Sequence, residues 1–541
     1  MKRLAALLLA CTAGPALAQD APRIDPAAVR AHVAFLADDL LEGRDAGTRG
    51  YDIAARYVAS HFEALGLKPG TPGGWYQPIT LQNAQADPAK PGALTIGGKM
   101  FAHGELAFVS PDGRSPNQSF SAPAVFVGHG IVAPEAGIDD YAGLDVRGKI
   151  VVFLAGTPTG LPSERAAQLD STKNVVAQDR GAVGLITLAT PEFLKRFPLA
   201  MIRREISRPT VRLIEPDGSP RYAAPGIKAQ AYAVEAAADA LFAGAPKSFA
   251  QVLADAAKPG AKLKGFALAA PVTIAQTTLV TTTRSPNVIG VLPGSDPALA
   301  REYVLLTAHL DHNGVNPNAP GEDKIFNGAM DNAAGVATML EAARAFVGSG
   351  RRPKRSVMFV ALTAEEDGLR GSDYLARHPV VPAGARVVAN VNLDMPVLTY
   401  PLSDVVAFGA EHSTIGETVN RAAKASGLTL SPDPMPEENV FTRSDHYSFV
   451  KQGVPAVMLA TGVKNGGGEA FKAFLATHYH KPSDQLSLPF NWDAAAKFAE
   501  VNYHIARDLA DAADAPRWYE GNVFGEQFAK GQPKAARPAA K

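Results

Sequence analysis

Metal-binding and acid/base residues follow short apolar runs in the second half of this 541-residue chain. Four runs share this arrangement: 303–306 before His309 and Asp311, 357–362 before Glu365 and Glu366, 387–393 before Asp394, and 455–459 before Thr461-Gly462. Imidazole nitrogens and carboxylate oxygens bind zinc, and carboxylates also transfer protons during hydrolysis. The four endings together predict a hydrolytic centre with two metal ions.

The apolar runs also predict the elements that position these residues. Short continuous apolar segments are typical of buried parallel strands in an α/β fold. In an open α/β sheet, ligands bind beyond the carboxyl ends of the strands. The side chains that follow the four runs should therefore meet at one edge of a mostly parallel sheet.

Asp331 supplies a further carboxylate, just before a predicted helix with apolar residues at Val336, Met339 and Leu340. An isolated aspartate in this place is usually a helix N-cap. Beside the other acidic and imidazole residues, its carboxylate can instead bridge two cations, with one oxygen on each. Two-metal hydrolases need a metal spacing of roughly 3.5–4 Å.

The adjacent pair Glu365-Glu366 predicts two different roles. Two solvated surface acids are the usual outcome for such a pair, but its place after the run 357–362 favours a functional site. A turn beyond the strand can aim both side chains at the metals. One would then be a ligand, and the other a general base that lies near the metals without binding them.

Histidines complete the predicted ligand set. Asp311 lies two residues after His309 and can orient its imidazole. His478 and His480 offer one more ligand, whereas His312 is interpreted as a polar neighbour of the site.

Composition limits the classes of function. The formal net charge is zero, and 46% hydrophobic with 20% charged residues is ordinary for soluble domains. A neutral chain gives no reason to expect nucleic acid or an anionic membrane surface as a partner. Cys11 is the only cysteine and lies in the segment expected to be removed, so a cysteine nucleophile and a thiolate zinc site are excluded.

Residues 1–18 have the three regions of a secretory signal peptide: Lys2-Arg3, the apolar stretch 4–10, and Ala16-Leu17-Ala18. We expect cleavage after Ala18 and a periplasmic or secreted mature protein. The apolar stretch is too short to span a bilayer, so no transmembrane segment is predicted. Lipoprotein anchoring at Cys11 ranks second, because the apolar stretch before it is short.

The rest of the chain divides into four predicted parts. Residues 19–120 contain two helical patterns, one that begins after Asp25 and one that ends at Gly66. Residues 121–275 contain short strands between Gly and Pro turns. Residues 276–520 have an α/β rhythm and carry the metal-binding residues, and residues 521–541 are predicted to be a disordered tail.

In this order and on these strands, the motifs resemble the co-catalytic di-zinc aminopeptidase family, the metallopeptidase family that also includes glutamate carboxypeptidase II. The resemblance covers nearly the whole mature chain. It is to the bacterial secreted type with an inserted protease-associated (PA) domain, here residues 121–275. It implies an α/β fold: a three-layer αβα zinc peptidase domain with a mostly parallel central sheet, plus a β-rich PA-like insertion.

The resemblance also implies two Zn²⁺ ions per chain and a role for each matching residue. These roles are His309 and Asp394 on one zinc, Glu366 and His480 on the other, Asp331 as the bridge, Glu365 as the general base, and Asp311 as the residue that orients His309. Relatives of this type tend to have a cis peptide after the bridging aspartate, here Asp331-Asn332.

One departure from the family pattern concerns the oxyanion. Several aminopeptidases of the family have a tyrosine shortly before the Ser-Asp-His motif, whereas Phe441-Thr442-Arg443 precedes Ser444-Asp445-His446 here. Tyr447, Arg443 or His446 could replace it.

The implied activity is that of a hydrolase, a zinc aminopeptidase that releases N-terminal residues from peptide substrates. A carboxypeptidase of the same family is the main alternative, and Arg370, Arg443 and Lys464 could bind its terminal carboxylate. Single-metal glutaminyl cyclisation and a non-catalytic, receptor-like binding protein are the others. The full set of ligands argues against both.

Overall fold

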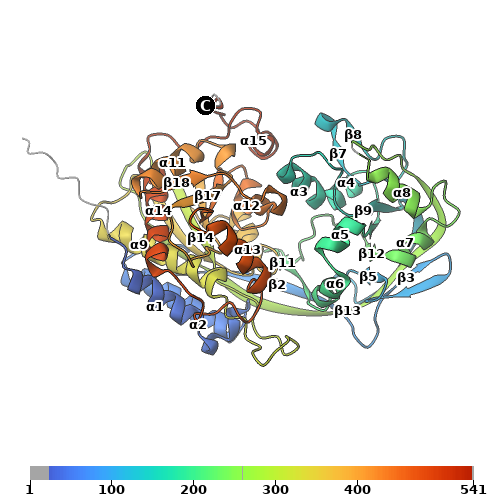
Figure 1. The fold of residues 1–541 in the computed structure, drawn as a ribbon, viewed down its shortest axis with the longest axis horizontal. Helices are drawn as coiled ribbons and strands as arrows, with labels where there is room; N and C mark the ends of the chain where they lie inside the picture. Colours follow the sequence, from blue (N-terminus) through green and yellow to red (C-terminus); the bar gives the residue numbers. More distant parts are fainter. Residues whose placement is uncertain (1–22, 259, 539–541) are drawn as a thin grey trace, which may run out of the picture.

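Strand β13 (Phe266–Leu292) runs through both lobes of the molecule. The computed structural model describes residues 23–258 and 260–538 (Figure 1). The first half of β13 pairs with β3 (Ala93–Ile96) and β6 (Asn117–Phe126), and its second half pairs with β2 (Tyr76–Ala86) and β15 (Ser356–Leu362). We call residues 87–277, apart from strand β11 (Thr210–Ile214), the inserted lobe, and the other described residues the main lobe.

The main lobe is built on a sheet with the strand order β11-β2-β13-β15-β14-β16-β19-β17-β18. Its centre, formed by β15, β14 (Glu302–His309), β16 (Arg386–Leu393) and β19 (Ala456–Thr461), is parallel throughout. The four predicted apolar runs are these four strands, which confirms the prediction. The outer strands are β1 (Lys68–Pro69), β11 (Thr210–Ile214), β17 (Asp404–Phe408) and β18 (Thr429–Ser431).

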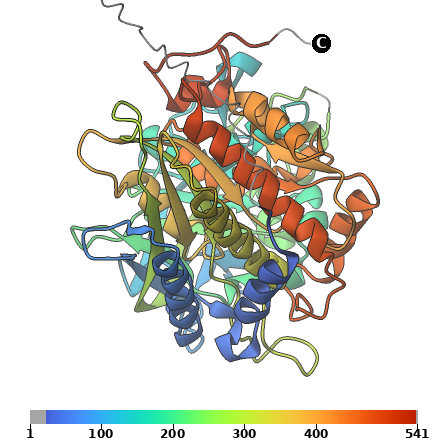
Figure 2. The ribbon, with the colours of Figure 1, turned by 90° about the vertical axis from the view of Figure 1, so that its left-hand side faces the viewer.

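Helices cover both faces of this sheet, so the predicted αβα architecture is confirmed. One face packs against α1 (Pro26–Leu36), α2 (Arg49–Ala64), α9 (Ala334–Gly348), α11 (Ile415–Ala425) and α14 (Trp492–Asp511) (Figure 2). The other face packs against α10 (Arg370–Arg377) and α12 (His446–Val450). Two further helices are α13 (Gly467–Thr477) and α15 (Val523–Phe528).

Local sequence explains the first two helices, both of which were predicted. The carboxylate of Asp25 accepts a hydrogen bond from the Ala27 N–H, and Pro26 fills the first turn of α1. Thr48 caps α2, which ends just before Gly66 in the left-handed region at φ +71°.

The inserted lobe has a mixed sheet and a core of its own. The strand order is β4-β3-β13-β6-β9-β10-β12-β5. Its remaining strands are β4 (Lys99–Ala102), β5 (Ala107–Val109), β9 (Ile150–Leu154), β10 (Gly184–Leu188) and β12 (Ala229–Ala233), with a separate pair β7 (Val132–Ala133) and β8 (Ile138–Asp139). Its helices are α3 (Ser163–Ser171), α4 (Lys173–Asp179), α5 (Pro191–Arg196), α6 (Leu199–Ile206), α7 (Glu235–Leu241) and α8 (Phe249–Ala256).

Short helical segments complete the described fold. Five are 3-10 helices, at Asp39–Arg44, Pro134–Ala136, Ala410–His412, Pro436–Glu438 and Val440–Thr442. One is a π-type segment, Ala329–Ala333, directly before α9.

Two expectations from composition differ from the structure. The inserted sheet already includes β3, β4 and β5, so this lobe begins before residue 121. Residues 521–538 are not a disordered tail: α15 buries Phe524, and Tyr519 pairs with Ala535. The average composition of the tail concealed the apolar side chains that fix it.

The predicted signal peptide, residues 1–18, lies outside the described residues. Within the described part of the chain, no helix combines the length and apolar character needed to cross a membrane.

Candidate metal centre

The carboxyl ends of β14, β15 and β16 bring the predicted metal-binding residues together at one edge of the main sheet. His309 is the last residue of β14, Glu365 and Glu366 lie shortly beyond β15, and Asp394 directly follows β16. The fourth run, β19, differs from the other three. It contributes Met458 to the wall of a cavity over these residues, described below, and neither Thr461 nor Gly462 lines that cavity.

His309, Asp331 and Asp394 form the first group of candidate ligands. Nε2 of His309 lies 3.1 Å from Oδ1 of Asp394 and 3.3 Å from Oδ1 of Asp331. The opposite ring nitrogen, Nδ1, donates to the main-chain carbonyl of Asp311 at 3.1 Å. A histidine whose second nitrogen is held by a carbonyl has the orientation and tautomer of a metal ligand.

Glu366 and Asp331 form the second group, together with His312 or with the predicted ligand His480. Nε2 of His480 lies 3.0 Å from Oε2 of Glu366 and 3.3 Å from Oδ2 of Asp331. His312 is fully buried, and its Nδ1 lies 2.6 Å from Oε1 of Glu366. The polar neighbour predicted at His312 is therefore in direct contact with this group.

Asp331 belongs to both groups, because each of its carboxylate oxygens faces a different histidine. It lies in the π-type segment before α9, and the Asp331-Asn332 peptide is cis, as the resemblance predicts. The main-chain N–H groups of Met330 and Asp331 each donate to the carboxylate of Asp484 at 3.0 Å. The buried Asp484 therefore fixes the backbone that presents the shared carboxylate.

The charges of the two groups are strongly coupled. Burial alone would lower the pKa of His480, but the facing carboxylates of Glu366 and Asp331 raise it to about 10. Burial alone would raise the pKa of Glu366, but His480 and His312 bring it well below its ordinary value. Each imidazole therefore holds its proton toward ionised carboxylates. A divalent cation bound by these residues would displace that proton, because a histidine ligand must be neutral and a carboxylate ligand ionised.

Buried polar atoms without a hydrogen-bond partner also indicate that these residues could hold two cations. Oε1 of Glu366 and both ring nitrogens of His312 are buried and lack a partner with hydrogen-bond geometry. Buried polar atoms of this kind need a partner. The 2.6 Å between Nδ1 of His312 and Oε1 of Glu366 leaves no room for an ion between these two atoms, but His312, Asp331 and Glu366 have candidate ligand atoms that all lie within 4.8 Å of one another. Imidazole nitrogens with carboxylate oxygens are typical zinc ligands.

Asp311 has a different contact from the one predicted. Its main-chain carbonyl, and not its carboxylate, holds His309. The two carboxylate oxygens accept the N–H groups of Glu365 at 3.1 Å and Glu366 at 3.2 Å. Asp311 thus fixes the turn that aims the adjacent glutamates in different directions.

Arg44 lies beneath the site, a residue that the sequence did not indicate. Its guanidinium is fully buried and donates to the carbonyls of Leu310, at 2.9 Å, and Asn327, at 2.6 Å. Burial lowers its pKa to about 10, while the nearby carboxylates of Asp311 and Asp484 act in the opposite direction. The N-terminal segment therefore supports the loops next to the candidate metal ligands.

A cavity of about 320 Å³ opens over both groups. The candidate metal ligands on its wall are His309, Asp331, Asp394 and His480, and Glu365 lies beside them. The apolar part of the wall consists of Phe197, Met395, Val440, Met458, Phe471 and Leu475. The site can therefore receive an apolar side chain beside the candidate metal ligands.

Tyr479 also lines the cavity, and sequence reasoning missed it. Its ring stacks on His480, with centroids 3.8 Å apart. Burial raises the pKa of its phenol well above the ordinary value, and Asp331 and Glu366 add to this shift, so the hydroxyl keeps its proton. The only sequence signal was its position next to a ligand.

The other candidates from the sequence separate into those near the cavity and those outside it. Arg443 lines the cavity. Tyr447 packs among Phe441 and Phe524, and His446 is fully buried, so neither is part of the cavity wall. His478 contacts Ser483 at 3.0 Å at the exposed surface and is not a ligand candidate.

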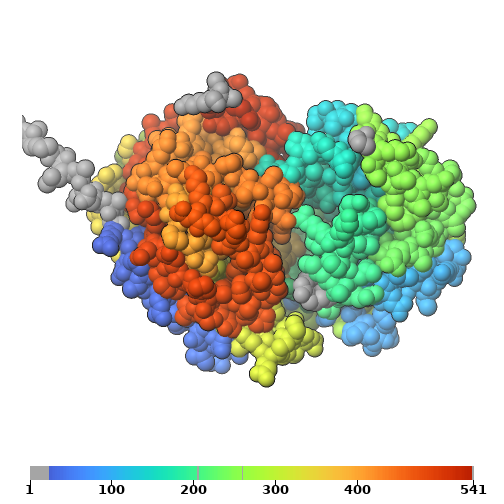
Figure 3. Space-filling model, in the orientation of Figure 1, coloured from blue at the N-terminus to red at the C-terminus, as the bar shows by residue number. Residues whose placement is uncertain are grey.

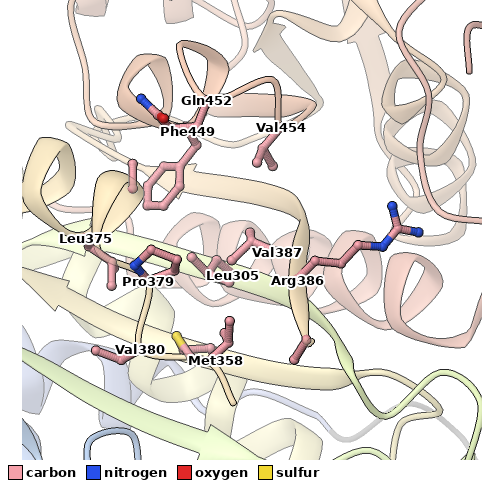
Figure 4. Close-up of a pocket in the computed structure, with 13 residues that line it drawn as sticks. Leu305, Met358, Leu375, Pro379, Val380, Arg386, Val387, Phe449, Gln452 and Val454 are labelled. Atoms are coloured by element: carbon pink, nitrogen blue, oxygen red, sulfur yellow. The ribbon is translucent and has the colours of Figure 1, made fainter. Parts of the chain in front are cut away.

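A second cavity, about 220 Å³, lies on the face of the main sheet that packs against α10 and α12 (Figure 4). Leu305, Met358, Leu375, Phe449 and Val454 are among its apolar lining residues. The guanidinium of Arg386 is turned away from them and pairs with Glu302 at 2.6 Å. This cavity lacks the acid/base groups that hydrolysis needs.

Comparison with known proteins agrees with this geometry. The sequence model of peptidase family M28 matches residues 287–506. These residues are a peptidase family M28 domain. All five candidate metal ligands and Glu365 lie within the M28 domain. The match confirms the metallopeptidase family that the motifs resemble, and it does not extend to the inserted lobe.

Individual relatives match only part of this chain, at moderate sequence identity. Leupeptin-inactivating enzyme 1 of Streptomyces exfoliatus is 29% identical over 242 residues, 41% of this chain and 50% of that protein. A probable zinc metalloprotease of Pyrenophora teres f. teres (strain 0-1) is 38% identical over 115 residues, 20% of this chain and 22% of that protein. The chain thus spans half or less of the length of these curated relatives.

The fold has a solved counterpart. The structure of the aminopeptidase from Aneurinibacillus sp. strain AM-1 is similar over 91% of this chain and 96% of that chain, with 21% identity and a TM-score of 0.51. This likeness establishes the fold of both lobes and does not by itself assign an activity.

Proposed function

We propose that this protein is a zinc-dependent aminopeptidase, an exopeptidase that removes N-terminal residues from peptides. The observation that carries the proposal is the shared carboxylate of Asp331, which joins two histidine–carboxylate groups beside Glu365 on the wall of one cavity. The M28 domain supports a peptidase, and the relative named as a probable zinc metalloprotease supports zinc.

Five residues would hold two zinc ions. They are His309 and Asp394 for one ion, His480 and Glu366 for the other, and Asp331 for both. When bound, zinc supplies polarisation of the scissile carbonyl and a water that is activated near neutral pH.

Glu365 serves as the general base in this proposal. It lines the cavity, whereas Glu366 is engaged by His480 and His312. A carboxylate oxygen of Glu365 accepts the proton of the attacking water and passes it to the nitrogen of the leaving amine. Burial raises the pKa of Glu365 well above its ordinary value, with Asp394 adding to the shift, so the carboxyl can hold the proton between the two transfers.

Tyr479 supplies a hydrogen-bond donor for the developing oxyanion. Tyr479 lines the cavity and its ring stacks on His480, and a fixed neutral donor of this kind is most effective where water is excluded. Arg443 is the remaining candidate from the sequence, and it lies on the same wall.

Cleavage from the N-terminus follows from charge. The free amine of a substrate would be held at the candidate metal centre, where the carboxylate of Glu365 lines the cavity without being assigned to a zinc ion and can attract a cationic amine. Comparing peptides of one sequence with free and acetylated N-termini tests this direction, with zinc content measured in parallel. We expect two zinc ions per chain and release of single residues only from the free N-terminus, lost on chelation.

Cleavage of the acetylated peptide from its C-terminal end would replace this proposal with a carboxypeptidase. One observation favours that second candidate: Arg443 lines the cavity and could bind a terminal carboxylate. The other two basic residues considered from the sequence do not line it. Arg370 is mostly buried beside Asp367, and Lys464 donates to Thr429 at 2.8 Å.

The location of the protein and the class of the inserted lobe are further proposals. The signal-peptide pattern of residues 1–18 supports a periplasmic or secreted protein. N-terminal sequencing of the mature protein should find cleavage after Ala18, whereas a lipid-modified Cys11 would make it a lipoprotein. The inserted lobe, with its mixed sheet next to the cavity, is proposed to be a PA-like domain that limits access to short or flexible peptides.

A further inference from the structure

The inserted lobe forms part of the wall of the substrate cavity. Arg196, the last residue of α5, and Phe197 line it opposite Glu438 and Arg443 of the main lobe. Figure 3 shows the hollow between the two lobes. A peptide bound at the candidate metal centre therefore contacts both lobes.

Two arginines on this wall share one carboxylate. Nη2 of Arg196 lies 2.8 Å from Oε2 of Glu438, and Nη1 of Arg443 lies 3.2 Å from the same oxygen. Arg196 also donates to the carbonyl of Glu437 at 3.4 Å, and Arg443 to the carbonyl of Glu438 at 3.2 Å. One carboxylate between two guanidinium groups leaves one excess positive charge.

This arrangement can accept a second carboxylate. The side chains of Arg196, Arg443 and Glu438 are 43%, 50% and 35% exposed, and ion pairs at such exposure contribute little stability, so they rearrange readily. Within the described residues, the hydrogen bonds of Arg443 use only Nη1. Its other N–H groups remain for a carboxylate, which arginine binds with two parallel hydrogen bonds.

The cavity therefore has charges of opposite sign on different parts of its wall. Glu365, which is not assigned to a zinc ion, makes the part beside the candidate metal centre acidic, and Arg196 with Arg443 makes another part basic. At about 320 Å³ the cavity is near the small end of ligand pockets, which span roughly 300–1,000 Å³. A short peptide with both ends free has the matching charges, an amine at one end and a carboxylate at the other.

We infer that Arg443, together with Arg196 from the inserted lobe, binds the C-terminal carboxylate of the substrate, and that the preferred substrates are peptides of two or three residues with both ends free. This inference rests on the proposed aminopeptidase activity. In this arrangement the side chain of the substrate's N-terminal residue contacts the apolar wall around Met395 and Met458. It also makes the inserted lobe a direct determinant of specificity.

Matched substrates test the inference. Each di- or tripeptide is compared with its C-terminal amide, which keeps the sequence and the N-terminal amine but removes the negative charge. In the unmodified protein we expect kcat/KM to be about tenfold higher for the free acid. In Arg443→Ala and Arg196→Ala this ratio should fall towards one, mainly through KM for the free acid.

A control variant separates this effect from a general loss of surface charge. Arg351 forms an ion pair with Asp511 at 3.3 Å, its side chain is 69% exposed, and it does not line the cavity. Arg351→Ala should keep the full preference for the free acid. Equal losses for acid and amide in Arg443→Ala would show a structural role for Arg443 and would overturn the inference.

A binding measurement keeps this test independent of turnover. Calorimetric titration of the Glu365→Gln protein with a tripeptide and with its amide should show tighter binding of the free acid, and adding Arg443→Ala should remove the difference. If the unmodified protein hydrolyses acid and amide equally well, the carboxylate site is wrong and the aminopeptidase proposal stands. If no peptide is hydrolysed but binding keeps the acid preference, the aminopeptidase proposal fails and the carboxylate site stands.

Discussion

Replacing Glu365 and Glu366 by glutamine, one at a time, separates the general base from the metal ligand. In Glu365→Gln the side chain can no longer accept a proton, whereas the main-chain N–H still donates to Asp311 at 3.1 Å. The neighbouring groups should therefore keep their geometry. Loss of a general base lowers turnover by about 10²–10⁴-fold, or about 3–5 kcal/mol in the barrier, and both zinc ions should remain.

Glu366→Gln should have a different outcome. Its carboxylate faces Nε2 of His480 at 3.0 Å and Nδ1 of His312 at 2.6 Å, and all three groups are largely buried. Removing one charged partner from a buried cluster costs about 3–5 kcal/mol. We expect one zinc ion to be lost on dialysis, together with activity.

The assay combines zinc content by mass spectrometry after dialysis with steady-state hydrolysis of a dipeptide. Glu341→Gln is the matched control, because Glu341 is a buried glutamate that pairs with His32 and Arg344 and does not line the cavity. It should keep both metals and full turnover. Equal zinc loss in Glu365→Gln and Glu366→Gln would refute the assignment of the two roles.

Three further predictions follow from the same structure. Asp484→Asn leaves a buried main-chain N–H at Met330 or Asp331 without its acceptor, so the free energy of unfolding should fall by about 1–3 kcal/mol and zinc affinity should weaken, as measured by urea denaturation and by chelator competition. Tyr479→Phe keeps the ring but removes the hydroxyl, so kcat should fall by about 10²–10³-fold at constant zinc content; an unchanged kcat would exclude it as the oxyanion donor. Burial, together with the nearby charge of Lys173, lowers the pKa of His129 from 6.5 to about 4. The unfolded state therefore binds more protons than the folded state between these values, so the free energy of unfolding should fall by about 2 kcal/mol as the pH is lowered from 7 to 5. His129→Asn should lose correspondingly less stability, as measured by urea denaturation at the two pH values.

The central sheet was predictable because each of its four strands contains a short apolar run and is buried along nearly its whole length. Residues 356–362 are all buried, so the segment has no polar alternation that would suggest a surface strand. The first boundary of the inserted lobe was not predictable in this way. β2 leaves the main sheet and β3 enters the other one within a few residues, and the two strands have similar alternating burial.

The candidate metal ligands were predictable because histidine, aspartate and glutamate are rare in apolar surroundings. The residues that position them were not, because their partners are main-chain atoms that no side-chain pattern encodes. Asp484 accepts two N–H groups from the segment around Asp331, and the carboxylate of Asp311 accepts those of the two glutamates instead of binding His309. Such contacts join loops that are far apart in sequence and appear only when the chain has folded.

Arg44 shows that the metal centre depends on more than the M28 domain at residues 287–506. Gly43 lies in the left-handed region at φ +68°, and a Cβ there would lie 2.5 Å from the carbonyl oxygen of Gly314, so only glycine allows this close approach. This close approach places the next residue, Arg44, against the carbonyls of Leu310 and Asn327. Both carbonyls belong to loops next to candidate ligands. Since α1 and α2 pack in the same core as α9 and α14, the segment before the inserted lobe completes both the core and the support of the site. The two parts of the main lobe are therefore one structural unit, and the lobe inserted between them contributes Arg196 and Phe197 to the cavity that this unit forms.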